Sequence, residues 1–272
     1  PGCKIAFGPY PCFSIYRCSM KIIRLIFFLS FISFSMLFSG DSAYPLENGK
    51  RTMGIFQPRI YGLKNNMELS THPILFLVKP NVKLKIFHGE KKGTGIASRY
   101  SLDYPTHFLR LIQHRGYFAF ISEDPDIGDI QHFLILQGEF LATKKLSNYS
   151  LSGKLGMSLC PGCEMDMRHL IDYDLIYPRM ALYHYRMGAN MGADLDYVHS
   201  EKINIKVDVD ILLLPEEQPF FEHKLLFHYN LSEKYTLSIG YKFSYGHYPF
   251  NKKREYWWNM FPLIDLRWQW TK

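Results

Sequence analysis

The motif Cys160-Pro-Gly-Cys163 is the sharpest local candidate for chemistry in this sequence. Two cysteines at this spacing can close a small disulfide across a Pro-Gly turn and stiffen a loop in an oxidising compartment. They can also act as redox thiols, but that use needs a strand–helix–strand setting that is missing here. A third option is half of a metal site, completed by the methionines and histidine of 165–169. No second such motif is present, so we expect the disulfide, with no metal and no cofactor.

Histidine offers a second kind of chemistry, because it titrates near neutral pH and serves as a general base in hydrolases. Several of the 11 histidines fall in expected loops or at strand ends. A lipid-modifying enzyme could place a catalytic histidine there, and the candidates are His72, His107, His114, His132 and His169. No spacing to a serine or a carboxylate singles one of them out. A lipid-modifying enzyme therefore stays as an alternative function, and we name no catalytic residue.

Charged residues that alternate with apolar residues form the third group. Between Ile203 and Ile211, isoleucine and valine alternate with Asn204, Lys206, Asp208 and Asp210. Successive side chains of a strand point to opposite faces, so this spacing gathers the charges on one face. The same rule predicts a shared set of lumen-lining residues: Lys83, Lys85, Lys206, Asp208, Asp210, Glu222, Lys224, Lys242, Asp265 and Arg267.

Such a set has two interpretations. Opposite charges across a narrow lumen create a transverse field that orients and filters small polar solutes. Alternatively, the charges pair with one another and fill the interior of a small barrel. The sequence is compatible with a narrow pore, a binding barrel or a structural membrane protein. We expect no enzyme activity from the lumen-lining charges.

Alternation of this kind recurs through residues 44–272 and predicts about eleven strands of roughly ten residues. They are 52–60, 67–72, 82–86, 94–102, 131–143, 149–158, 183–198, 202–214, 221–230, 235–245 and 264–270. Short turns alternate with long connections at 103–130, 159–182 and 246–260, which is typical of an up-and-down meander with two unequal rims.

The strand number must be even if both termini lie on one side of a closed barrel. We therefore expect ten strands, or twelve if 44–51 or 73–79 supplies another. Within 103–130, the segment 107–114 has the pattern of a short amphipathic helix. The segment 118–121 is another candidate for an extra strand.

Two features favour an apolar face that is turned toward lipid. Strands of about ten residues match a tilted crossing of the hydrocarbon layer. Aromatic residues also crowd strand ends, as in 241–250, 256–261 and 268–270, and such rings favour the membrane–water boundary. A soluble secreted ligand-binding barrel, with its apolar face inward, is the competing interpretation.

Composition excludes several other classes of protein. The chain of 272 residues is 47% hydrophobic and 16% aromatic, which excludes a disordered chain. Its net charge of +7 falls to +4 when residues 1–43, with four basic residues and one acidic residue, are left out, and this mild excess does not indicate nucleic acid as a partner.

The start of the sequence has the features of a secretory signal. Lys21 and Arg24 precede an apolar run from Leu25 to Phe38, which small residues follow. We expect 1–19 to be upstream sequence or a fragment edge, 20–43 to be a signal peptide and 44–272 to be a single barrel domain. An uncleaved anchor helix is the alternative for the apolar run.

The signal, the alternating strands and an aromatic-rich last strand from Leu263 to Trp270 together resemble bacterial outer-membrane β-barrel proteins. The resemblance implies an all-β, antiparallel, up-and-down transmembrane barrel of about 10–12 strands in the outer membrane, porin-like, with its apolar face outward. It implies the lipid bilayer, the outer-membrane insertion machinery and small polar solutes as partners. That class favours an aromatic last residue, whereas here Thr271 and Lys272 follow Trp270.

Overall fold

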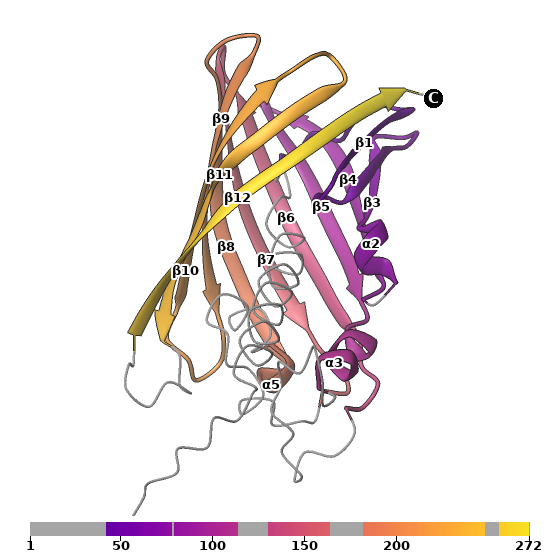
Figure 1. Ribbon diagram of the computed structural model, residues 1–272, viewed down its shortest axis with the longest axis vertical. Helices are drawn as coiled ribbons and strands as arrows, with labels where there is room; N and C mark the ends of the chain where they lie inside the picture. The colour runs from indigo at the N-terminus through magenta and orange to yellow at the C-terminus, as the bar shows by residue number, and fades with distance from the viewer. Residues whose placement is uncertain (1–41, 78, 114–129, 164–181, 248–255, 272) are drawn as a thin grey trace, which may run out of the picture.

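The computed structural model describes residues 42–77, 79–113, 130–163, 182–247 and 256–271. Within these ranges, antiparallel strands form one closed barrel in which each strand pairs with its neighbours along the chain and β1 closes on β12 (Figure 1). The strands are β1 (Lys50–Gly54), β2 (Arg59–Gly62), β3 (Met67–Thr71), β4 (Asn81–Lys91), β5 (Thr94–Asp103), β6 (Ile135–Lys145), β7 (Tyr149–Leu159), β8 (Met187–Val198), β9 (Ile203–Leu213), β10 (Phe220–Asn230), β11 (Tyr235–His247) and β12 (Tyr256–Thr271). The predicted up-and-down barrel is confirmed.

Within the described residues, three short helices accompany the strands: α2 (Pro73–Phe76), α3 (Thr106–Gln113) and α5 (Leu182–Tyr185). Helix α3 confirms the helix expected at 107–114, whereas the candidate strand 118–121 lies outside the described residues. No helix in the described ranges is long and apolar enough to cross a bilayer.

The twelfth strand arises within a segment that we expected to be one strand. Residues 52–60 divide between the end of β1 and the start of β2, with Ile55-Phe56-Gln57-Pro58 between them. Proline has no N–H to donate to a strand ladder, and the chain turns back here into a hairpin. The alternatives that we expected for the twelfth strand were wrong, because most of 44–51 precedes β1 and 73–79 contains α2.

The last hairpin is also longer than predicted. Strand β11 continues to His247 and β12 begins at Tyr256, so the connection expected over 246–260 is much shorter. Three aromatic residues follow one another in the sequence at Tyr256-Trp257-Trp258, so no alternation with polar residues was visible there.

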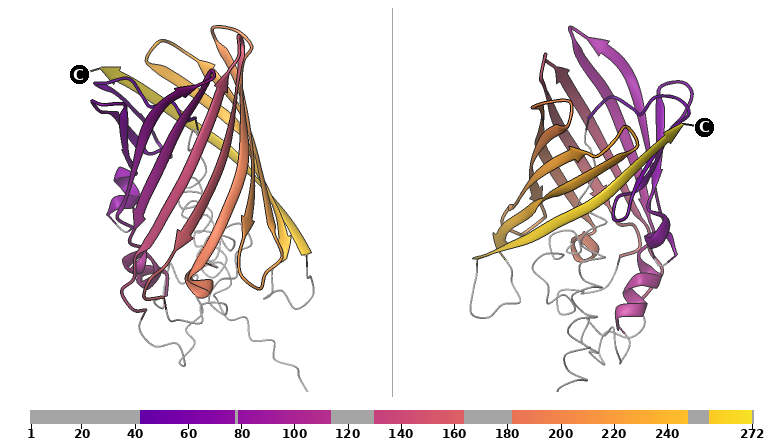
Figure 2. Two further views of the ribbon diagram at one scale, coloured as in Figure 1. Left: turned by 180° about the vertical axis from the view of Figure 1, so that it is seen from behind. Right: turned by 45° about the horizontal axis from the view of Figure 1, so that its top comes forward.

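The two ends of the barrel differ. One end carries the C-terminus and the short turns, and we call it the turn end; the other carries α3 and α5, and we call it the loop end (Figures 1 and 2). At the turn end, Lys92 and Gly93 join β4 to β5 with φ of 52° and 73°. A two-residue hairpin turn with both φ values positive matches the twist of the strands that it joins.

The inner and outer faces differ sharply in polarity. On β7, Leu155 and Met157 point outward and are 58% and 61% exposed, whereas Lys154 and Ser158 point inward and are 6% and 7% exposed. In a soluble protein the ionised side chains face the solvent instead. The predicted outward apolar face is therefore confirmed.

Outward aromatic residues gather near both ends of the barrel. Tyr245 opposes Trp258 near the loop end, and Tyr235 opposes Trp268 near the turn end. Tyr149 opposes Tyr197 near the turn end as well. Aromatic rows at two levels, with aliphatic side chains between them, match the two boundaries of a bilayer.

Candidate functional site: an ion-paired lumen

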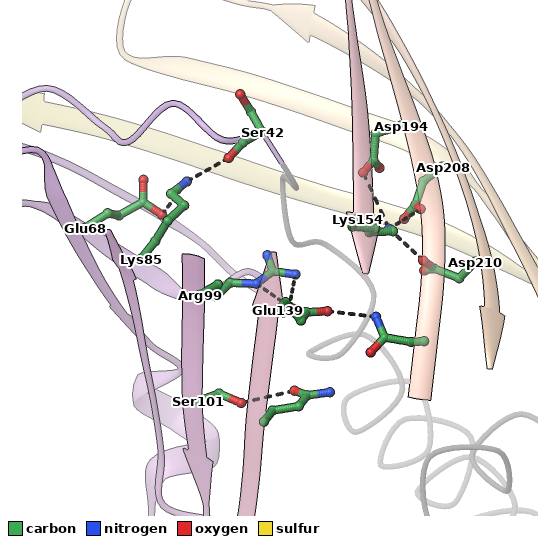
Figure 3. A network of polar contacts seen from close by, with 12 residues as sticks. Ser42, Glu68, Lys85, Arg99, Ser101, Glu139, Lys154, Asp194, Asp208 and Asp210 are labelled. Carbon is green, nitrogen blue, oxygen red and sulfur yellow. Dashed lines mark hydrogen bonds and ion pairs between the residues drawn. The ribbon is translucent and has the colours of Figure 1, made fainter. Parts of the chain in front are cut away.

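The largest ionic cluster of the described residues lies on the inner wall formed by β7 to β10 (Figure 3). Lys154 Nζ on β7 lies 2.7 Å from Asp208 Oδ1 and 2.7 Å from Asp210 Oδ1, both on β9. It also lies 3.5 Å from Asp194 Oδ2 on β8. Lys224 on β10 contacts the second oxygen of Asp208. We call these five residues the aspartate cluster; three carboxylates face two ammonium groups, so its formal charge is negative.

The aspartate cluster depends on a glycine. Lys154 reaches β9 by crossing β8, and Gly192 lies on β8 under its path. A Cβ atom at Gly192 would lie 2.4 Å from Lys154 Cε and 2.4 Å from Asp210 Oδ1, much closer than a real contact allows. The absence of a side chain at this position therefore lets the lysine join carboxylates two strands away.

A second pair continues this inner wall toward β11. Lys242 Nζ donates to Glu222 Oε1 at 2.6 Å, and the two residues are 2% and 1% exposed. Glu222 and Lys224 are separated by one residue on β10, so both face inward. The row of charges thus extends across neighbouring strands.

Other ion pairs line the wall formed by β3 to β6. Arg99 donates through Nε to Glu139 Oε2 at 2.6 Å, and Glu139 also accepts from Asn190 Nδ2 at 2.9 Å. Lys85 Nζ lies 3.0 Å from Glu68 Oε1. These pairs and the aspartate cluster join strands that are one or two places apart in the barrel. They therefore line the wall rather than bridge opposite sides of the lumen.

The connection between β1 and β2 folds into the barrel. Phe56 N donates to Asp265 Oδ1 at 3.0 Å, and the Phe56 ring packs against the buried, inward-facing side chains of Leu226 and Leu263. His72 Nε2 lies 3.1 Å from the carbonyl oxygen of Phe56. The segment 55–57 therefore narrows the lumen with an aromatic ring. In the strand order, β1 stands opposite β7, which carries Lys154.

The chain before β1 also lies against the inner wall. Ala43 N donates to Thr143 Oγ1 at 2.7 Å, and Ala43 is fully buried. The Tyr44 hydroxyl donates to Glu90 at 2.8 Å, and Lys85 Nζ donates to the carbonyl of Tyr44 at 3.2 Å. Apart from Ser42 and Ala43, the signal predicted at 20–43 lies outside the described residues.

All of the lumen-lining residues proposed from the sequence occupy inward positions of their strands, and most are buried. The buried ones are Lys85, Lys206, Asp208, Asp210, Glu222, Lys224, Lys242 and Asp265, whereas Lys83 and Arg267 are half-buried. Sequence reasoning missed Lys154 and Asp194 of the aspartate cluster, and also the pair Arg99–Glu139. Alternation of Leu151, Leu155 and Met157 with polar residues was the signal that could have placed Lys154 on the inner face.

The other candidates for chemistry lie near the loop end. Cys160 and Cys163 are disulfide-bonded and buried, and Gly162 between them has φ of 81°, a conformation that glycine adopts readily. The Met and His residues of 165–169 lie outside the described residues. In the part of the chain that the structure describes, no group of three or more His, Cys, Asp or Glu could hold a metal ion.

The histidines considered for catalysis are dispersed. His107 and His132 both lie beside Tyr104, with ring centroids 5.2 and 5.9 Å from the Tyr104 ring, and the Tyr104 hydroxyl contacts His132. His72 contacts backbone, as described above, and His114 and His169 lie outside the described ranges. Two histidine–serine contacts were not expected: His88 with Ser98 on the outer face, and His228 with Ser238 inside.

Comparison with solved structures returns outer-membrane barrels of the same general architecture. The KdgM porin in complex with disordered oligogalacturonate is 7% identical, with a TM-score of 0.45, over 80% of this chain and 95% of that chain. OmpT of Vibrio cholerae is 7% identical, with a TM-score of 0.42, over 78% and 64%. The CymD monoaromatic hydrocarbon channel is 8% identical, with a TM-score of 0.38, over 82% and 61%.

The chain therefore spans less than two thirds of the length of the second and third of these proteins. No protein-family model matches the sequence, and neither does any curated protein. The closed barrel with its outward apolar face and inward charges has the architecture of bacterial outer-membrane β-barrels.

Proposed function

We propose that this protein spans a bacterial outer membrane and that its narrow, charge-lined lumen passes or binds small polar solutes. The observation that carries the proposal is the band of buried, inward-facing ion pairs, above all the aspartate cluster. A barrel that served only as a scaffold would gain little from this band. Replacing buried ion pairs with well-packed apolar residues is often neutral or stabilising.

The ion pairs named above follow the wall of the barrel. Each of them joins strands that are one or two places apart. Fixed charges of opposite sign along a narrow lumen set up a field that orients and filters small polar solutes. The ring of Phe56, which packs against Leu226 on β10 and Leu263 on β12, adds an apolar group to the interior and restricts the size of the solute.

Conductance across a planar lipid bilayer tests the proposal. We expect small, discrete conductance steps from the purified full chain. We also expect the reversal potential in a KCl gradient to shift when charged residues of the aspartate cluster are substituted. Asp208→Asn removes a negative charge that faces Lys154 and Lys224, so it shifts selectivity toward anions. Lys224→Met shifts it toward cations, because it removes a positive charge that contacts Asp208.

Lys144→Gln provides a matched control, because Lys144 is exposed and lies on the outward face of β6. This variant should leave selectivity unchanged. Folding of each variant is checked by the change in gel mobility on heating that closed barrels show. If the folded protein does not conduct, or if it conducts but neither lumen variant shifts its selectivity, the proposed passage of solutes through a charge-lined lumen is wrong.

A further inference from the structure

Two arginines lie on the outer surface at the turn end, where they face away from the lumen. Arg51 on β1 is directly opposite Trp270 on β12 and Tyr61 on β2. Directly opposed residues share one face of a sheet. Trp270 lies on the same face of β12 as Ile264, which is 55% exposed and points outward. Arg59 is two positions from Tyr61 on β2, so it lies on this outward face as well.

The two guanidinium groups share aromatic neighbours. Arg51 Cζ lies 5.4 Å from the centroid of the Tyr61 ring. Arg59 Cζ lies 4.8 Å from the same centroid and 5.4 Å from that of the Trp270 ring. Such contacts attract a cation to the face of a ring and hold the guanidinium in place. They do not use its N–H donors, which lie in the plane of the group.

The donors of this pair are not matched by protein acceptors. Within the described ranges, neither Arg51 nor Arg59 forms an ion pair with a carboxylate, and Arg59 Nε is buried without a hydrogen-bond acceptor. A buried donor without an acceptor is unfavourable, and two like charges beside one ring repel each other. Both features are relieved by an anion that binds between the two guanidinium groups.

The surroundings indicate which anion this is. Tyr61 and Trp270 continue the row of outward aromatic residues at the turn end, which marks the level of the lipid headgroups. The anions at that level are lipid phosphates, and the planar guanidinium fork fits two phosphate oxygens at once. We infer that Arg51, Arg59, Tyr61 and Trp270 form a binding site for the phosphate of an anionic phospholipid in the leaflet at the turn end.

This site rests on the orientation of the barrel in a bilayer and not on passage of solutes through the lumen. Its test therefore measures lipid binding alone. The purified full chain is extracted from nanodiscs of phosphatidylcholine that contain a minority of phosphatidylglycerol, and native mass spectrometry counts the lipids that stay bound. We expect the wild-type protein to retain phosphatidylglycerol in preference to phosphatidylcholine.

The double variant Arg51→Gln/Arg59→Gln should lower retention of phosphatidylglycerol by about tenfold or more, because it removes charge-assisted hydrogen bonds to the phosphate. Arg59→Lys keeps the positive charge but loses the planar guanidinium and its stacking on the rings, so we expect an intermediate loss of phosphatidylglycerol retention. This variant replaces the double variant in the test if the double variant does not fold. Lys144→Gln, an outward cation near the same end of the barrel on β6, should retain the lipid at the wild-type level.

A titration separates the two sources of phosphate. Short-chain phosphatidylglycerol should compete for the site at much lower concentration than inorganic phosphate, because the lipid tails also bind the apolar surface around it. Equal retention of phosphatidylglycerol by the wild type and by Arg59→Lys would overturn the inference. So would equal retention of the two lipids by the wild type, or stronger competition by inorganic phosphate.

Discussion

Replacement of Lys154 by methionine should strongly destabilise the barrel. The methionine keeps most of the length of the side chain but removes the ammonium group that lies 2.7 Å from both Asp208 and Asp210. Removing one partner of a buried ion pair typically costs 3–5 kcal/mol, because the other charge stays buried. Lys224 still contacts Asp208, so we expect the lower end of this range, about 3 kcal/mol.

A loss of that size lowers the folding equilibrium constant by roughly 100-fold. Urea titration of the protein in lipid vesicles, followed by tryptophan fluorescence, measures it. The double variant Lys154→Met/Asp210→Asn should recover part of the loss, because it removes one of the carboxylates that the lysine had neutralised. Ser150→Met, also on the inward face of β7 but near the turn end, provides a control for the added methionine.

If Lys154→Met unfolds at the same urea concentration as the wild type, the aspartate cluster does not depend on this lysine. If Asp210→Asn in the Lys154→Met background lowers stability further, repulsion between the carboxylates is not what destabilises the Lys154→Met variant. Either result would refute the electrostatic account of this wall.

Three further predictions address the lumen and the loop end. Gly192→Val should destabilise the barrel by about 1–3 kcal/mol in the same urea assay, because its Cβ would overlap Lys154. Gly153→Val is the control, because Gly153 faces outward into open space and its replacement should not destabilise the barrel in this way. Phe56→Ala should raise single-channel conductance in planar bilayers, because it removes the ring that narrows the lumen. Cys160→Ser/Cys163→Ser should speed proteolysis at residues 160–163 and lower barrel stability by about 2 kcal/mol or less, because a disulfide that closes so short a loop constrains the unfolded chain only modestly.

Strand pattern and the inside-out arrangement could be predicted from the sequence, because a lipid-facing wall imposes strict alternation on each strand. The run from Ile203 to Ile211 shows this directly, and β9 occupies that position with its charges inward. Helix α3 was predictable for a similar reason, because its apolar residues recur at helical spacing. The register of the barrel then follows from short turns such as the one at Lys92 and Gly93.

Contacts between residues that are far apart in the sequence leave no periodic pattern, so they could not be predicted from the sequence of a single strand. The inward fold of Phe56 depends on a contact with Asp265, which lies 209 positions further along the chain. Lys154 could be assigned to the inner face from alternation, but its reach to Asp208 and Asp210 depends on the gap that Gly192 leaves on the strand between. The site formed by Arg51 and Arg59 likewise exists only because β1 closes the barrel against β12.

The arrangement of apolar residues toward lipid and ionic residues toward the interior is tested most directly by spin labels placed in turn at each position of β7. In a cysteine-free background reconstituted in bilayers, labels at the Leu151, Leu155 and Met157 positions should collide with dissolved oxygen, which concentrates in acyl chains. Labels at the inward Ser150, Ser152 and Ser158 positions should collide with oxygen much less often, because the barrel wall separates them from the acyl chains. The opposite alternation, or no alternation along the strand, would contradict the account.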